Sequence, residues 1–290
     1  MSFVALVTDS TAGLAGEYAQ QHGIRVVPLY LNMDNTTYRD GVDITPQKFY
    51  ERLPTCTPLP TTSQPSAGDF GKVYREAIKD GASAIISIHL SSGISGTVNS
   101  AQLAKEQVGS VPIEIIDTQS AAVSQVFALQ AAIGALKGGA DLAGAVAAIR
   151  KVLESLRLVF TVDTLEYLYK GGRIGGAAAL LGSLLQFKPV LHFREGKIDA
   201  LERVRKSSRS LTRLVELMEE TFGSSEPLRA MIMHAACEDR AKALQEVLCK
   251  QLNIVDVMIL PLSPVLGAHC GNGTLGLACC PQAAFPPDSK

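Results

Sequence analysis

The 290-residue chain has no tryptophan, and aromatic residues make up only 6% of it. Proteins that bind single-stranded nucleic acid stack bases on aromatic side chains, so no such surface is expected. Neither sign of charge predominates, because 27 lysines and arginines balance 28 aspartates and glutamates. This balance excludes the basic surface of a dedicated nucleic-acid-binding protein and any strong attraction of the whole molecule to an anionic membrane.

Long hydrophobic runs and secretion signals are also missing. The longest apolar region, residues 123–136, is interrupted by Ser124, Gln125 and Gln130, which indicates a buried helix and not a membrane span. No basic segment precedes the first acidic residue, Asp9, so we expect no signal peptide and a cytoplasmic protein. The six cysteines form no C-x-x-C pair, which favours reduced thiols over a zinc site.

The chain has no motif for binding ATP. No G-x-x-x-x-G-K-[ST] segment occurs, so a phosphate-binding P-loop is absent. Residues 271–276 match G-x-G-x-x-G, but only 14 residues follow them, too few to complete a βαβ unit. We interpret these glycines as a tight turn before a last strand, and we expect neither a cofactor nor a metal.

What the first half does contain is a regular alternation of short β-branched runs and longer helical stretches. This alternation predicts helices packed on a mostly parallel sheet. Strands are predicted at residues 3–7, 24–31, 84–89 and 113–116, and helices at 15–21, 46–53, 67–79, 97–107, 120–136 and 142–153.

The second half has a different order of elements. Two strand-like runs flank Arg194-Glu195-Gly196, which predicts a β-hairpin and antiparallel pairing. The predicted elements are strands at residues 158–162, 188–193, 197–204, 228–234 and 254–260, with helices at 208–222 and 240–252. We therefore predict an α/β fold of two domains, a mostly parallel N-terminal domain over residues 1–155 and a mixed α/β domain over residues 156–290.

Four polar or glycine-rich loops, at residues 8–11, 60–66, 91–97 and 171–176, are expected where strands end, the usual position of ligand sites in open α/β sheets. Hydroxyls and backbone N–H groups gathered before a helix suit a carboxylate or another anion. A single loop of this kind could merely cap its helix. Two of them on neighbouring βα units favour a ligand site instead.

A serine hydrolase is an alternative. Residues 93–97 approach the G-x-S-x-G motif but end in threonine, so the nucleophile elbow is not matched. Ser95 could still form a triad with His269 and Asp9. His269 itself is placed in a glycine-rich loop.

Taken together, the loops resemble the DegV family, the fatty-acid-binding proteins that serve as acyl-carrying subunits of bacterial fatty acid kinase. The resemblance covers nearly the whole chain. It runs in order through Thr8-Asp9-Ser10, Thr62-Ser63-Gln64-Pro65, residues 90–97, residues 169–174, Lys188-Pro189-Val190, Val204-Arg205 and the loop around His269.

This resemblance implies a DegV-like fold with one long-chain fatty acid, such as palmitate, buried in a tunnel between the two domains. It implies that Thr62 and Ser95 hold the carboxylate. The further site residues that it implies are Ser63, Ser92, Gly96 and Arg173. The Ala-, Leu- and Gly-rich residues 174–187 suit a tunnel wall, although ordinary helix packing explains them equally well.

The resemblance also implies a partner. A separate ATP-binding subunit related to dihydroxyacetone kinases would phosphorylate the bound acid to an acyl phosphate for phospholipid metabolism, with Arg205 and a protonated His269 supporting the transfer. The chain would then be a lipid carrier and no enzyme by itself, with transient contact to a membrane surface allowed. Residues 207–209 and the Cys279-Cys280-Pro281 segment depart from the family pattern, so the kinase-docking surface is less defined than the lipid site.

Overall fold

The computed structural model describes residues 3–181, 187–205 and 207–287, without the side chains of residues 207–209. Its first sheet is fully parallel, in the order β2-β1-β6-β7. The strands are β1 (Phe3–Asp9), β2 (Ile24–Val27), β6 (Ala82–His89) and β7 (Ile113–Asp117). The expected parallel sheet is therefore confirmed.

Helices cover both faces of this sheet, and the side-chain alternation along β1 shows why. Ala5 and Val7 point into a core with α3 (Ala67–Lys79) and α4 (Thr97–Val108). Val4 and Leu6 point the other way, into the main core with α5 (Val123–Lys137) and α6 (Leu142–Ser155). A strand buried on both faces is typical of parallel sheets, and explains the continuous apolar run in the sequence. The short α1 (Gly16–Gln21) precedes β2.

The second sheet has six strands in the order β10-β9-β8-β13-β11-β12, and within it only β11 and β12 pair in parallel. The predicted hairpin is confirmed. The strands are β8 (Arg157–Thr161), β9 (Lys188–Arg194), β10 (Lys197–Val204), β11 (Leu228–His234), β12 (Ile254–Pro261) and β13 (Leu275–Pro281). The helices α8 (Ser207–Phe222) and α9 (Glu238–Gln251) pack over one face of this sheet.

The prediction of one strand over residues 24–31 was wrong. The run divides into β2 and β3 (Tyr30–Met33), which belong to different sheets. Pro28 stands between them, and proline has no N–H group to continue a ladder. β3 pairs with β4 (Thr36–Arg39) and β5 (Thr61–Ser63) in a small antiparallel sheet, so part of the expected 60–66 loop is a strand.

The prediction of His269 in a loop was also wrong. It lies near the end of a seven-residue helix, α10 (Pro264–Cys270), and not in a loop. The Ser263 hydroxyl accepts a hydrogen bond from the Leu266 amide and so caps this helix. The glycines of residues 271–276 do form the predicted turn before the last strand, β13.

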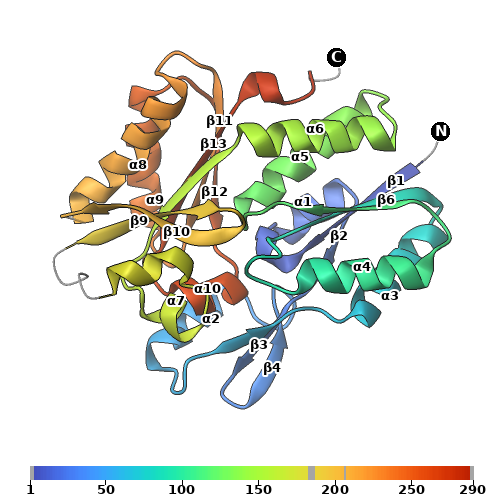
Figure 1. Cartoon of the computed structure of the whole chain (residues 1–290), viewed down its shortest axis with the longest axis horizontal. Helices are drawn as coiled ribbons and strands as arrows, with labels where there is room; N and C mark the ends of the chain where they lie inside the picture. The colour runs from blue at the N-terminus through green and yellow to red at the C-terminus, as the bar shows by residue number, and fades with distance from the viewer. Residues whose placement is uncertain (1–2, 182–186, 206, 288–290) are drawn as a thin grey trace.

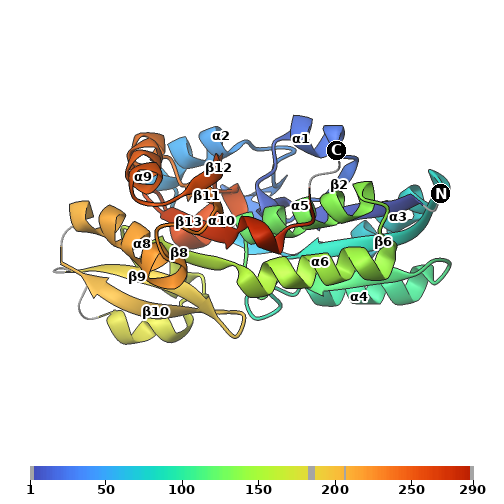
Figure 2. The ribbon, with the colours of Figure 1, turned by 90° about the horizontal axis from the view of Figure 1, so that it is seen from above.

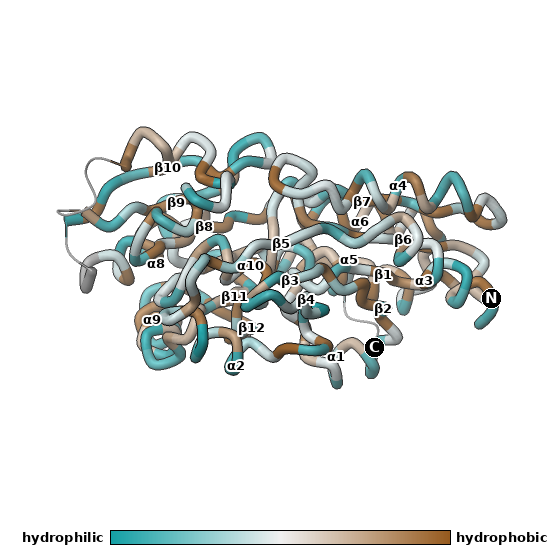
Figure 3. Tube along the Cα trace, turned by 90° about the horizontal axis from the view of Figure 1, so that it is seen from below, coloured by the Kyte–Doolittle hydropathy of each residue, from teal (hydrophilic) through white to brown (hydrophobic). Residues whose placement is uncertain are grey.

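Figure 1 shows the two large sheets side by side along the long axis of the molecule, with α3 and α4 at one end and α8 and α9 at the other. In the same view α10, α2 (Pro46–Arg52) and α7 (Glu166–Lys170) lie below the second sheet. The view from above shows the same order along the molecule (Figure 2). Along α4, hydrophilic and hydrophobic residues alternate in the tube (Figure 3), as expected for a helix with one buried face. Within the described residues, no helix is long and apolar enough to cross a bilayer.

Candidate ligand-binding site

A cavity lies between the two large sheets. The part of its wall that the N-terminal half of the chain contributes lies just beyond the carboxyl ends of the parallel strands. Ligands of α/β proteins usually bind at this position. Most of its wall is apolar and belongs to both halves of the chain. The apolar lining residues are Leu29, Leu90, Ile94, Ala121, Ala122, Leu158, Phe160, Phe193, Ile198, Met233, Leu262, Val265 and Leu266.

Polar side chains enter the cavity from four separate segments. Thr62 and Ser63 come from β5, Ser95 from the loop before α4, Arg173 from the turn after α7 and His269 from α10. Thr62 Oγ1 lies 2.7 Å from His269 Nε2, joining residues that are far apart in the sequence. The Ser95 hydroxyl lies 2.9 Å from Thr97 Oγ1. The cavity thus combines a small polar region with a large apolar one.

Backbone carbonyls hold the Arg173 guanidinium in place. Its Nε donates to Ile94 O at 3.1 Å, and its Nη1 donates to Gly171 O at 2.7 Å. Gly171 in turn packs directly against the histidine, since a Cβ added there would lie 2.3 Å from His269 Nδ1. Only glycine therefore allows the turn after α7 to approach α10 this closely.

His269 is neutral near pH 7. Burial, together with the positive charge of Arg173, lowers the pKa of its imidazole to about 4. The expected protonated His269 belongs to the state with a phosphate beside it, and that role stays a prediction. The Nδ1 atom is buried and has no hydrogen-bond partner among the described residues. Of the two ring nitrogens of His269, only Nε2 has a hydrogen-bond partner among the described residues, the Thr62 hydroxyl.

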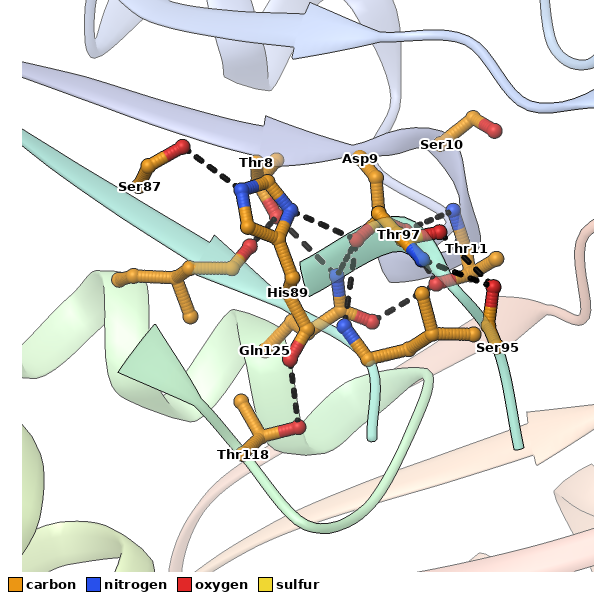
Figure 4. Close-up of polar contacts among 12 residues, drawn as sticks. Thr8, Asp9, Ser10, Thr11, Ser87, His89, Ser95, Thr97, Thr118 and Gln125 are labelled. Atoms are coloured by element: carbon orange, nitrogen blue, oxygen red, sulfur yellow. Dashed lines mark hydrogen bonds and ion pairs between the residues drawn. The ribbon is translucent and has the colours of Figure 1, made fainter. Parts of the chain in front are cut away.

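A second polar network lies at the carboxyl ends of β1 and β6 (Figure 4). The buried Asp9 carboxylate accepts hydrogen bonds from Gln125 Nε2 at 3.0 Å and the Leu90 amide at 3.2 Å, and lies 3.0 Å from His89 Nδ1. Burial alone would raise the pKa of Asp9, but the hydrogen bonds and the nearby His89 lower it below its usual range. The Leu90 contact ties this network to the loop that carries Ser95.

The structure does not assemble the triad that a hydrolase would need. Asp9 contacts His89, the His269 imidazole contacts Thr62, and the Ser95 hydroxyl contacts Thr97. Ser87 does lie 2.6 Å from His89 Nε2, but Ser87, His89 and Asp9 are all fully buried. Because no substrate can reach these three side chains, they form a structural network and not a catalytic triad.

Three of the expected site residues do not line the cavity. Ser92 donates its hydroxyl hydrogen to Asp117 Oδ2 at 2.5 Å. Gly96 lies beside the cavity, since a Cβ there would come within 2.8 Å of the Gln64 amide nitrogen. Arg205 lies on the surface after β10, with its guanidinium 5.8 Å from the centre of the Phe187 ring.

The expected tunnel wall is not confirmed either. None of the described residues in the 174–187 segment lines the cavity, and residues 182–186 lie outside the described part of the chain. Many of the actual wall residues were missed because they come from α10 and from the strands of the second sheet. Gln64, Cys270 and Thr274 are polar lining residues that were missed as well. Gln64 could have been found, because it stands next to the two hydroxyls in Thr62-Ser63-Gln64-Pro65.

Comparison with known proteins agrees with this geometry. The model of the family described as "Uncharacterised protein, DegV family" matches residues 3–282. The chain belongs to the DegV family. Protein DegV of Bacillus subtilis is 36% identical over 278 residues, which cover 96% of this chain and 99% of that protein.

Solved structures of the DegV family have the same fold. A DegV family protein from Thermus thermophilus described as binding fatty acid superposes with a TM-score of 0.90 at 36% identity, covering 96% of this chain and 99% of that one. DegV of Bacillus subtilis, described as a fatty acid binding protein, gives a TM-score of 0.88 at 34% identity, with coverage of 97% and 100%. The predicted fold class and family are therefore confirmed.

Proposed function

We propose that the cavity between the sheets binds one long-chain fatty acid. The observation that carries this proposal is a cavity with a mostly apolar wall that is also lined by the hydrogen-bonded Thr62 and His269 and by Ser95. Burying an acyl chain contributes about 0.8 kcal/mol per methylene, so the 14 methylenes of palmitate contribute roughly 11 kcal/mol before the cost of association. The fatty acids bound by the DegV proteins from Thermus thermophilus and Bacillus subtilis support the same ligand class.

The polar region suits a carboxylate because it offers donors in place of water. We assign the imidazole proton of His269 to Nε2, since an N–H group at the buried, unpartnered Nδ1 would have no acceptor. Nε2–H then donates to Thr62 Oγ1, which leaves the Thr62 hydroxyl hydrogen free for a carboxylate oxygen. The Ser95 hydroxyl is the second donor.

The chain acts, in this proposal, as a carrier that presents the carboxylate to an ATP-dependent kinase subunit related to dihydroxyacetone kinases. A carboxylate oxygen attacks the γ-phosphorus of ATP, the bond from that phosphorus to the β–γ bridging oxygen breaks, and ADP leaves. The chain has no P-loop of its own, which supports the need for a partner. Arg205, exposed and outside the cavity, is suited to the transferred phosphate and not to lipid retention.

The test separates these roles by substitution. Thr62→Ala and Ser95→Ala should weaken fatty acid retention by about tenfold each, since each removes one hydrogen bond to a charged group. Ser92→Ala is the matched control, because its hydroxyl is engaged with Asp117 outside the cavity. Arg205→Ala should leave retention unchanged and lower acyl phosphate formation with the kinase subunit.

Retention is measured by isothermal titration with palmitate and by extraction of the purified protein. Equal loss of lipid in all four variants would contradict the division between binding and transfer residues. The hydrolase alternative is tested with the same preparations. Purified protein alone should not turn over an acyl ester, because no carboxylate orients His269 among the described residues.

A further inference from the structure

The loop between β6 and α4, which carries Ser95, is docked against the second half of the chain. It meets the β9–β10 hairpin at the turn, where Gly196 lies. The Ser91 hydroxyl donates a hydrogen bond to Gly196 O at 2.6 Å, and Ser91 is only 1% exposed. Phe193 and Ile198 of the same hairpin line the cavity between the sheets. The contact therefore joins two walls of that cavity, one from each half of the chain.

Two glycines allow this contact to be close. Gly196 has a φ of +74°, a conformation that glycine adopts readily. A Cβ added at Gly196 would lie 2.5 Å from Ser91 Oγ, and a Cβ added at Gly93 would lie 2.5 Å from Gly196 O. Any larger residue at either position would push the loop and the hairpin apart.

Ser91 also organises the loop from within. Its hydroxyl accepts a hydrogen bond from the Gly93 amide at 3.0 Å. Its carbonyl accepts hydrogen bonds from the Ile94 and Ser95 amides, both at 3.2 Å, and its own amide donates to Ser120 O at 2.7 Å. One residue thus fixes both the distance of the loop from the hairpin and the course of the backbone that leads to Ser95.

We infer that Ser91 is a positioning residue for the carboxylate site, which holds the Ser95 hydroxyl toward the bound acid by docking the loop on the hairpin. Ser91 itself is not among the residues that line the cavity. Ser95 Oγ accepts a hydrogen bond from the Thr97 amide at 3.3 Å, which leaves its hydrogen able to reach a carboxylate oxygen. Hydrogen bonds weaken steeply with distance and angle, so a loop that shifts loses this donor. The inference rests on the proposed function, since it concerns where the carboxylate of the fatty acid is held.

Isothermal titration of delipidated protein with palmitate and with hexadecanol tests this role. Hexadecanol has a chain of the same length and no carboxylate. Ser91→Ala should weaken palmitate binding about tenfold and hexadecanol binding less than about twofold, because only the charged head group depends strongly on the Ser95 donor. A merely structural role would weaken the binding of both ligands alike. Ser92→Ala is the matched control, because its hydroxyl donates to Asp117 in the same half of the chain.

A second measurement needs no ligand. Gly196→Ala alters only the hairpin, yet it should speed hydrogen exchange in peptides that cover residues 91–97 of the ligand-free protein by about tenfold. The matched control is Gly223→Ala, where φ is +77° and the added Cβ has no neighbour within 4 Å among the described residues. This variant has the same backbone strain, and it should leave the exchange of residues 91–97 unchanged.

Four results, in a protein that still binds palmitate, would overturn the positioning role. They are unchanged palmitate binding by Ser91→Ala, equal losses for palmitate and hexadecanol, an equal effect of Ser92→Ala, and normal exchange of residues 91–97 in Gly196→Ala. Failure of the wild type to bind palmitate would instead contradict the proposed function, and the role of Ser91 with it.

Discussion

At the scale of single residues, burial moves two titratable groups in opposite directions. The pKa of the Asp40 carboxyl is raised to about 7 and that of the His269 imidazole is lowered to about 4. Both changes favour the neutral form, as desolvation does. The two residues therefore give opposite dependences of folding stability on pH, and each can be measured.

For Asp40, the folded carboxyl keeps its proton up to about pH 7, whereas the unfolded one loses it near pH 4. The stability that the protonated Asp40 carboxyl contributes is therefore lost as the pH rises from about 4 to about 7. Asp40 should destabilise the protein by roughly 2–3 kcal/mol more at pH 8 than at pH 5. Asp40→Asn should thus raise the free energy of unfolding more at pH 8 than at pH 5, as measured by urea denaturation. Asp43→Asn, at an exposed carboxylate that pairs with Arg39, should show no such difference, and an identical gain at both pH values for Asp40→Asn would refute the assignment.

For His269, the unfolded imidazole takes up a proton below pH 6.5 and the folded one only near pH 4. Stability is therefore lost as the pH falls through this window, by about 2 kcal/mol between pH 7 and pH 5. His269→Asn should make the urea midpoint less sensitive to acid over this range. His22→Asn, at a histidine that is only half-buried, serves as the control. If the acid sensitivity of His269→Asn matches that of wild type, the imidazole is not buried in its neutral form.

At the scale of elements, the turn after α7 and the helix α10 depend on each other. Gly171→Ala would place a Cβ 2.3 Å from His269 Nδ1 and 2.9 Å from Tyr167 O. We expect this variant to displace His269, to lower stability by about 1–3 kcal/mol and to weaken palmitate retention.

The matched control is Gly68→Ala in α3, where the nearest atom to the new Cβ is Ser66 Oγ at 3.5 Å. This variant should keep or slightly raise stability, because alanine is the better helix former. Thermal unfolding and titration with palmitate measure both effects. Normal palmitate binding by Gly171→Ala would show that the close approach of α7 to α10 is not needed for the site.

The elements that the sequence predicted well are those with a strong local pattern. The hairpin of β9 and β10 follows from the Glu195-Gly196 turn, and α3 follows from its Ser66–Asp69 capping box. α10 was missed because seven residues with an internal glycine carry no periodic signal, and its stability comes from packing against α2 and α7. The 24–31 run resembles one strand because apolar residues flank Pro28 on both sides, although proline cannot continue the ladder.

The candidate site was predictable only in part, for a similar reason. Thr62, Ser63, Ser95, Arg173 and His269 stand in short motifs, and the structure brings all five to one cavity. Outside this site, Asp40 gave no signal, because Arg39-Asp40-Gly41 is typical of an exposed turn and only tertiary packing buries the carboxylate. The roles of the site residues stay predictions.

At the scale of the whole molecule, the cavity is built from both halves of the chain, so its occupant stabilises the assembled structure. The two large sheets are formed by residues 3–117 and 157–281, and a domain boundary near residue 155 stays a prediction. A ligand that binds only the folded protein shifts unfolding by mass action.

Palmitate added to delipidated protein at 100 times its dissociation constant should therefore stabilise the fold by about 2.7 kcal/mol. For a chain of this size that amounts to a rise of several degrees in the unfolding temperature. Differential scanning calorimetry measures the rise, and Ser95→Ala should show less of it at the same palmitate concentration. An unfolding temperature that does not respond to palmitate would argue against a buried lipid site.

The central claim is that the cavity between the sheets holds one fatty acid. Mass spectrometry of the purified protein, first native and then denatured and extracted with organic solvent, tests it most directly. We expect a native mass excess equal to one long-chain fatty acid and the same acid in the extract. A native mass equal to that of the bare chain, in a protein that also fails to take up added palmitate, would contradict the claim.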